Sequence, residues 1–127
     1  MRKLVILGAL VALLVVAFAP AALARTFTCT DYPCSGTANR DIINERPAAG
    51  TPDHISGLRG GDVIDAGISF DDFDFVYGNR GADTIYTDDG DDLDEAHGGA
   101  GFDTCYVDTG DLYFSCEVLY IDGVLQT

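Results

Sequence analysis

An aspartate recurs at nearly fixed intervals through most of this chain, and that spacing limits the possible folds more than any other feature. Successive members are 12, 9, 12, 9, 11 and 9 residues apart: Asp41, Asp53, Asp62, Asp74, Asp83, Asp94 and Asp103. Two positions after each stands a small or apolar residue: Ile43, Ile55, Ile64, Val76, Ile85, Ala96 and Cys105. Taken in pairs, the spacings give coils of 21, 21 and 20 residues. A period of this length is typical of a stacked repeat rather than of a globular core.

The repeat unit is Gly-x-x-Gly-x-Asp-x-apolar-x. Residues 57–65, 78–86 and 98–106 fit it, and residues 36–44 fit with Asn39 as the second glycine, a mild change because Asn tolerates positive φ. These units are every second repeat, so a coil of two short strands and two turns would place their aspartates on one flank and Asp53, Asp74 and Asp94 on the other. No useful stretch has an apolar period near 3.6. We expect an all-β fold: a parallel β-roll or β-solenoid of short strands with glycine-rich turns.

Residues 1–24 have the features of a secretory signal peptide. Arg2 and Lys3 precede an apolar run that ends at Phe18, and Ala22-Leu23-Ala24 supplies a small-x-small cleavage site. The alternative is a membrane anchor, which needs roughly 20 apolar residues, more than this run provides. We expect a secreted, extracellular protein whose mature chain begins at Arg25.

The mature chain would be strongly acidic. Loss of Arg2 and Lys3 reduces seven basic residues to five arginines, against 21 Asp and Glu, for a net charge of −16. Such a surface repels nucleic acid and anionic membranes and attracts cations. High acidity also occurs in disordered chains, but regular glycines, β-branched residues and aromatics after residue 36 favour a folded chain.

Four cysteines lie toward the two ends of the mature chain, and an even number in an exported protein favours disulfides. Sequence alone allows three pairings. We favour Cys29 with Cys34 and Cys105 with Cys116, one bridge at each end of the repeats. The alternative, a zinc site, needs paired Cys and His ligands at tighter spacing. The chain then divides into a cysteine-containing lead-in at 25–35, repeats at 36–115 and a C-terminal cap or tail at 116–127.

Stacked carboxylates make calcium the first ligand to consider. Coils of a β-stack lie about 4.8 Å apart, and two carboxylates at about 5 Å repel by roughly 3 kcal/mol at an effective dielectric near 20. A divalent ion between them reverses this penalty. Calcium accepts six to eight oxygen ligands in flexible geometry, whereas magnesium prefers to keep its waters. Few apolar residues are expected to point inward (the seven above and Phe114), so the metal-free state would be loose or partly unfolded.

These repeats resemble the RTX, or haemolysin-type, calcium-binding repeat, whose nonapeptide is Gly-Gly-x-Gly-x-Asp-x-U-x with U a large apolar residue. The resemblance spans residues 36–115. It implies a β-roll that folds around Ca²⁺ held between stacked glycine-rich turns by repeat aspartates and loop carbonyls. Carried over by position, the best ligands are Gly57, Arg59, Gly60 and Asp62; Gly78, Arg80, Gly81 and Asp83; Gly98, Ala100, Gly101 and Asp103. The further candidate metal ligands are Asp41 and, on the opposite flank, Asp74 and Asp94.

The chain departs from this family in its longer coils, since two nonapeptides make a coil of about 18 residues. The longer loops lack the glycine pattern, and their acidic runs at 71–74 and 88–94 could bind calcium in another geometry or form a solvated acidic face. The register there is ambiguous, because Asp92 keeps the nine-residue step from Asp83 whereas Asp94 keeps it to Asp103.

We expect a binding protein rather than an enzyme. The sequence has no Gly-x-Ser-x-Gly nucleophile motif, and no deep pocket is expected from a thin roll. The alternative function is an adhesion module that binds matrix or glycan through an aromatic strip, with calcium only structural. The strip consists of Tyr77, Tyr86, Tyr106, Phe75 and Phe102, and the other interpretation of these rings is cross-strand packing. We expect a monomer that binds calcium ions, and a cell-surface or glycan partner stays open.

Overall fold

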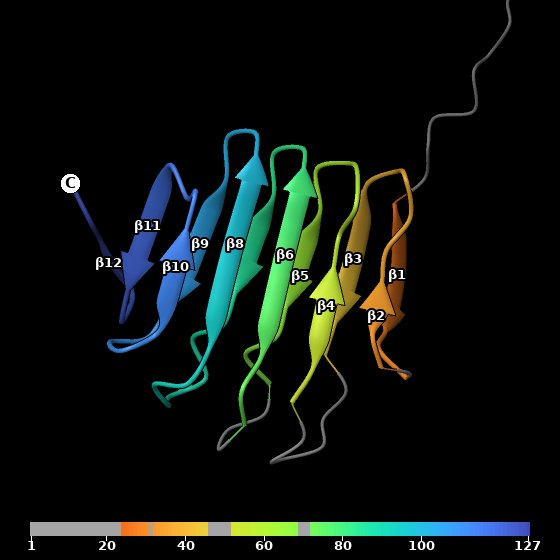
Figure 1. Cartoon of the computed structure of the whole chain (residues 1–127). Helices are drawn as coiled ribbons and strands as arrows, with labels where there is room; N and C mark the ends of the chain where they lie inside the picture. The colour runs from red at the N-terminus through yellow and green to blue at the C-terminus, as the bar shows by residue number, and fades with distance from the viewer. Residues whose placement is uncertain (1–23, 31, 46–51, 69–71) are drawn as a thin grey trace, which may run out of the picture.

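The chain is all-β and winds into a β-solenoid, as the sequence predicts. A computed structural model describes residues 24–30, 32–45, 52–68 and 72–127, and these contain strands but no helix (Figure 1). The segment expected to be a signal peptide lies outside the described residues, apart from Ala24. Within the described part of the chain, no helix is long and apolar enough to cross a membrane.

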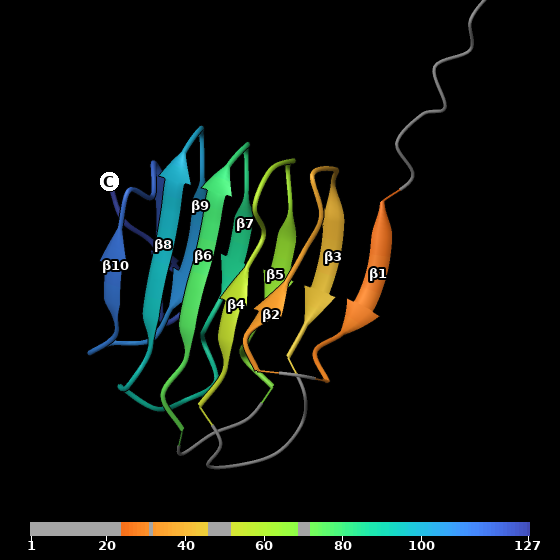
Figure 2. The same cartoon turned by 45° about the vertical axis from the view of Figure 1, so that its right-hand side comes forward.

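Each coil contributes one short strand to each of two sheets that face one another (Figure 2). The first sheet has the order β1 (Arg25–Thr28), β3 (Asp41–Asn44), β5 (Val63–Asp65), β7 (Thr84–Tyr86), β9 (Thr104–Val107), β11 (Val118–Ile121) and β12 (Val124–Leu125). The second has the order β10 (Leu112–Phe114), β8 (Glu95–Ala100), β6 (Phe75–Arg80), β4 (His54–Ser56) and β2 (Cys34–Ser35). All neighbours are parallel except β11 and β12, which are antiparallel.

The core is a column of side chains between the sheets. Strand pairing aligns Ile43 with Ile64, and Ile64 with Ile85. The seven small or apolar residues that follow the periodic aspartates are all fully buried, as predicted: Ile43, Ile55, Ile64, Val76, Ile85, Ala96 and Cys105. Side chains alternate inward and outward along each strand, so an aspartate two positions earlier also points inward.

Two disulfides join the predicted partners, one toward each end of the stack. Cys29 is bonded to Cys34 and Cys105 to Cys116, with Cα atoms 5.5 and 5.8 Å apart. No free cysteine remains to bind zinc. Disulfides are typical of proteins in oxidising compartments. The lead-in itself joins the solenoid, because β1 pairs with β3 and β2 with β4.

Aromatic rings stack along the outer face of each sheet. On the first sheet, Tyr106 lies between Tyr86 and Tyr120, with centroids 4.6 and 4.5 Å apart and planes within 11°. On the second sheet the stack has four rings: His54, Tyr77, His97 and Phe114. The inner rings of each stack cover one another's faces, and sugar recognition would need those faces. This arrangement favours the interpretation of the rings as cross-strand packing.

Candidate metal centre

The connections between strands differ on the two flanks of the solenoid. The short-turn flank, at the top of Figure 1, carries the glycine turns that enter β3, β5, β7 and β9. On the long-loop flank, at the bottom, the ends of β3, β5, β7 and β9 lie beside the starts of β4, β6, β8 and β10. Each flank holds one row of buried aspartates.

On the short-turn flank the aspartates form a hydrogen-bonded ladder. The Oδ1 atom of Asp62 accepts the backbone N–H of Asp41 at 2.7 Å, Asp83 accepts that of Asp62 at 2.8 Å, and Asp103 accepts that of Asp83 at 2.8 Å. All four side chains are at most 1 % exposed. The predicted row therefore exists, and each carboxylate supplies the hydrogen-bond partner that an N–H needs where the turn meets the sheet.

The long-loop flank repeats the ladder. Asp74 accepts the N–H of Asp53 at 2.7 Å, Asp94 accepts that of Asp74 at 2.8 Å, and Asp111 accepts that of Asp94 at 3.1 Å. Asp94 thus occupies the row, whereas Asp92 is exposed, which resolves the ambiguous register.

The last loop, at 108–111, is shorter than the others and brings Leu112 level with Glu95. Tyr113 is therefore level with buried Ala96, and Phe114 lies outside against His97, 47 % exposed. The expectation that Phe114 points into the core is wrong, because the shorter loop shifts the register by one residue.

The ladders use only one oxygen of each carboxylate. Among the described residues, the second oxygen, Oδ2, has no hydrogen-bond partner and is buried in five ladder aspartates: Asp62, Asp83 and Asp103 on one flank, and Asp74 and Asp94 on the other. A buried, unpaired carboxylate oxygen is costly. A bound cation or a proton would remove that cost.

On the short-turn flank, these free oxygens face glycines. The Oδ2 atoms of Asp62 and Asp83 each lie 2.5 Å from the place where a Cβ of Gly57 or Gly78 would stand. The carbonyl oxygen of Gly98 lies 2.6 Å from that place at Gly78. A side chain there would fill the space that the carboxylate uses, so the interior of each turn collects a carboxylate oxygen and a carbonyl of the next coil.

The other ligands predicted on this flank lie further out. Arg59, Arg80 and Ala100 are exposed, and the carbonyls of Arg80 and Ala100 accept the N–H groups of Gly60 and Gly81 at 2.9 and 3.0 Å. These carbonyls hold neighbouring coils together. The structure therefore brings Gly57, Gly78 and Gly98 close to their aspartates, whereas the carbonyls of Arg80 and Ala100 make hydrogen bonds between coils.

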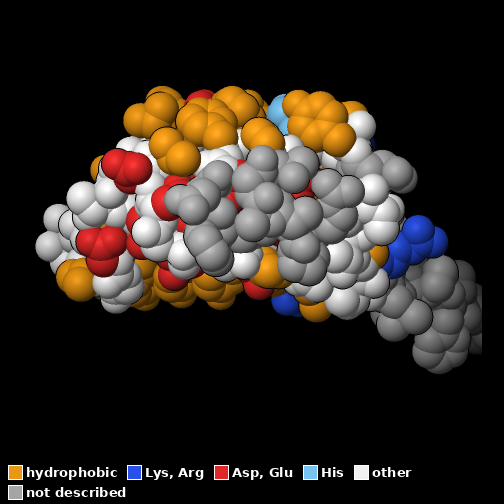
Figure 3. Space-filling view, turned by 90° about the horizontal axis from the view of Figure 1, so that it is seen from below, with side chains coloured by type: hydrophobic (Ala, Val, Ile, Leu, Met, Phe, Trp, Pro, Cys, Tyr) orange, Lys and Arg blue, Asp and Glu red, His pale blue; other side chains and the backbone are white. Residues whose placement is uncertain are grey.

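The long-loop flank gathers acidic side chains into three overlapping clusters. Within each, carboxylate oxygens lie within 4.8 Å of one another: Glu45, Asp72 and Asp74; Asp72, Asp89 and Asp91; Asp91, Asp94 and Asp111. Asp72 belongs to the first two clusters and Asp91 to the last two, so the three form one continuous row across the coils. Figure 3 looks onto this flank and shows Asp and Glu side chains between two bands of hydrophobic side chains.

Burial and crowding shift the titration of this row. Burial raises the pKa of Asp74 to about 7, and the charges of Asp72 and Glu45 add to the shift. Burial raises the pKa of Asp94 to about 8, with contributions from Asp74 and Asp111. These carboxyl groups resist losing their protons unless a positive charge lies nearby.

Sequence reasoning identified Asp74 and Asp94 but missed Glu45 and Asp111. Glu45 continues the inward alternation of Asp41 and Ile43 by one step, at a position that Ala66, Thr87 and Val107 fill in later coils. That alternation was the available signal for Glu45. Asp111 follows Asp94 by only 17 residues and falls outside the spacing rule.

Comparison with protein-family models, with curated proteins and with solved structures found no match to this chain. Its function is therefore inferred from the site itself.

Proposed function

We propose that this chain is a secreted protein that binds calcium along the long-loop flank of its β-solenoid. The observation that carries the proposal is the continuous row of seven carboxylates in three clusters. In this row Asp74 and Asp94 are buried, and each has one oxygen without a hydrogen-bond partner in the described part of the chain. Three divalent ions would supply six positive charges to these seven carboxylates. Without them, ionised carboxylates would lie within 4.8 Å of one another in a partly desolvated site.

The donor atoms favour a hard cation. Every cluster residue offers oxygen, and the cysteines that a softer metal would need are all in disulfides. Irregular loops with partly dehydrated oxygens suit the variable coordination of calcium better than the strict octahedron of magnesium. Calcium modules outside cells typically have Kd values of about 10⁻⁴ to 10⁻³ M, matched to their surroundings.

The resemblance to RTX repeats also supports calcium, but it predicts ions in the glycine turns. That second set of sites remains a prediction. The short-turn flank offers one free carboxylate oxygen per coil with a nearby glycine carbonyl, whereas each long-loop cluster offers three carboxylates. The long-loop flank is therefore proposed as the stronger set.

Calorimetric calcium titration of paired Asp→Asn variants would test the proposal. Asp72→Asn with Asp91→Asn removes the two carboxylates shared between clusters, so it should weaken or abolish binding at all three. Asp62→Asn with Asp83→Asn keeps the ladder acceptor oxygens and should leave the long-loop binding events intact. Asp92→Asn, exposed and in the same acidic run, is the matched control and should bind as the parent does.

Two results would contradict the proposal. Absence of any binding below millimolar calcium would remove the calcium function altogether. Loss of calcium binding in the Asp62 and Asp83 variant, with normal binding in the Asp72 and Asp91 variant, would move the ions to the glycine turns.

A further inference from the structure

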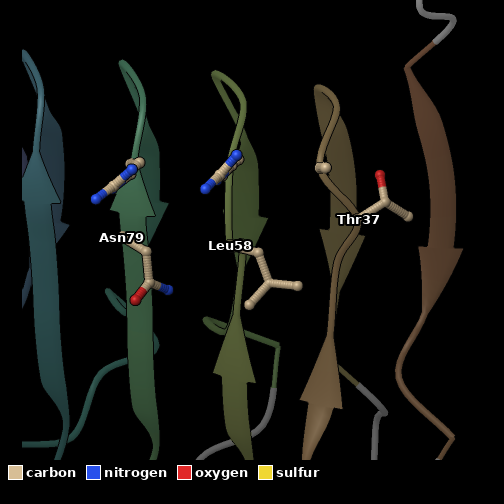
Figure 4. A pocket seen from close by; sticks show the side chains of 6 residues that line it. Thr37, Leu58 and Asn79 are labelled. Carbon is tan, nitrogen blue, oxygen red and sulfur yellow. The ribbon is translucent and has the colours of Figure 1, made fainter.

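A pocket lined by two arginines, and so opposite in charge to the acidic row, lies on the second sheet near the short turns. It has a volume of ≈ 400 Å³ and is lined by two rows of residues that repeat from coil to coil: Thr37, Leu58 and Asn79, and Ala38, Arg59 and Arg80 (Figure 4). It is separate from the acidic row, which occupies the other flank. A pocket of this volume is within the range of small-molecule sites.

Two arginines supply its charge. Arg59 and Arg80 pair in parallel register as a β-bridge, so their Cα atoms lie one strand spacing apart, about 4.8 Å. Within the described residues, no carboxylate forms an ion pair with either guanidinium, although the chain has 21 acidic residues. Two neighbouring guanidinium groups repel unless an anion lies between them, and their planar donor geometry suits a carboxylate.

A strained leucine supplies the apolar part. Leu58 has a φ of 76° and is 42 % exposed. Asn79 takes a φ of 73° at the same position one coil later, where its Nδ2 donates to Ser56 Oγ and to the Tyr77 carbonyl. Positive φ is tolerated by Asn but costly for a bulky side chain, and such strain collects at binding sites. Leu58 therefore presents an exposed apolar surface at a position where the backbone favours other residues.

We propose that this pocket binds a small monocarboxylate with an apolar tail. The carboxylate lies between the Arg59 and Arg80 guanidinium groups, and the tail packs on Leu58 and Ala38. The ligand does not share residues with the calcium row, so the two sites can be tested separately.

NMR titration of the calcium-loaded protein with hexanoate tests this site through the Arg Nε–H and backbone signals of residues 58–61. Acetate and hexanol are the matched probes, each of which lacks one half of the ligand. Hexanoate should saturate these shifts and bind more tightly than either probe. Arg59→Gln with Arg80→Gln should weaken hexanoate at least about tenfold, while Arg40→Gln, another exposed arginine outside the pocket, leaves it unchanged.

Leu58→Asn separates the two parts of the pocket, because Asn accepts the backbone conformation but removes the apolar contact. It should bring hexanoate affinity close to that of acetate. Equal hexanoate binding by the parent and the double arginine variant would overturn the proposal, and so would shifts that never saturate. Arginine-dependent dimers in sedimentation without hexanoate would also overturn it, because the anion would then come from a second copy. Unchanged calcium affinity of each variant shows that it is folded.

Discussion

Five buried aspartates of this protein each serve two purposes: Asp62, Asp74, Asp83, Asp94 and Asp103. One oxygen closes the inter-coil ladder, as Asp83 does for the N–H of Asp62. The other oxygen has no hydrogen-bond partner among the described residues and is available to a cation. Asparagine could also accept the ladder hydrogen bond, but its buried NH₂ group would replace the oxygen that is available to a cation. Aspartate is therefore the residue that combines a ladder acceptor with a metal ligand.

Substitution of Asp83 separates these functions. Asp83→Ala leaves the buried N–H of Asp62 without an acceptor and should lower the free energy of unfolding by about 1–3 kcal/mol. Asp83→Asn keeps an acceptor oxygen and should cost less. Urea denaturation at pH 5.5 without calcium measures both values, and equal losses would show that the ladder bond contributes nothing.

The stacking of the turns depends on glycine at a few positions. Gly81 has a φ of 145°, and a Cβ there would overlap the carbonyl oxygen of Gly60 in the preceding coil. Gly90 also has positive φ, 104°, but no heavy atom of the described residues lies within 4 Å of its Cβ position, its two chain neighbours aside.

Comparing alanine substitutions at these two glycines separates the cost of steric overlap between coils from the cost of an unfavourable backbone conformation. Gly90→Ala should cost about 1–3 kcal/mol from the backbone alone. Gly81→Ala should cost clearly more, because two coils must also move apart. Thermal unfolding in saturating calcium compares them, and identical Tm values would mean that the coils are not packed as described.

At the scale of elements, the sequence predicted which strand residues are buried but not which loop residues lie close together. The fixed nine-residue step into each glycine turn predicted the row from Asp41 to Asp103, and period-two alternation predicted the buried column from Ile43 to Cys105. The long loops vary in length, so the spacing could not show that Asp91 lies near Asp72 on one side and near Asp111 on the other. The one wrong inward assignment, Phe114, has the same cause.

The long-loop flank should make the metal-free protein sensitive to pH. Asp74 and Asp94 have folded-state pKa values of about 7 and about 8, above the ordinary value of 3.8. Between pH 3.8 and these folded-state pKa values, the folded state binds more protons than the unfolded state. The stability from these two groups is therefore greatest below the ordinary pKa and is lost as the pH rises through about 7 to 8.

Tm should therefore fall from pH 5 to pH 8 in calcium-free buffer, by at least about 5 °C. Saturating calcium at pH 8 should restore it, because the ion replaces the protons. Scanning calorimetry measures both effects. A Tm that rises with pH in the absence of calcium would contradict the burial of these carboxylates.

At the scale of the whole molecule, a thin column of buried apolar residues supports a long stack of acidic coils. Cys29–Cys34 and Cys105–Cys116 constrain the ends, and β12 folds back against β11. The middle coils have no such constraint and carry the acidic row. Their folding is therefore expected to depend on bound ions.

Calcium should raise the stability of the whole solenoid. One site at a free calcium concentration of 100 times its Kd contributes about 2.7 kcal/mol, and several sites contribute more. Tm should rise by at least about 10 °C, whereas an equal concentration of magnesium should have a much smaller effect. Equal stabilisation by the two ions would indicate screening of charge rather than coordination.

Anomalous diffraction from crystals of the calcium-loaded protein measures the central claim most directly. The predicted result is a line of calcium peaks along the long-loop flank, bridged by Asp72 and Asp91. Peaks confined to the glycine turns near Asp62 and Asp83, or no peaks at all, would contradict it.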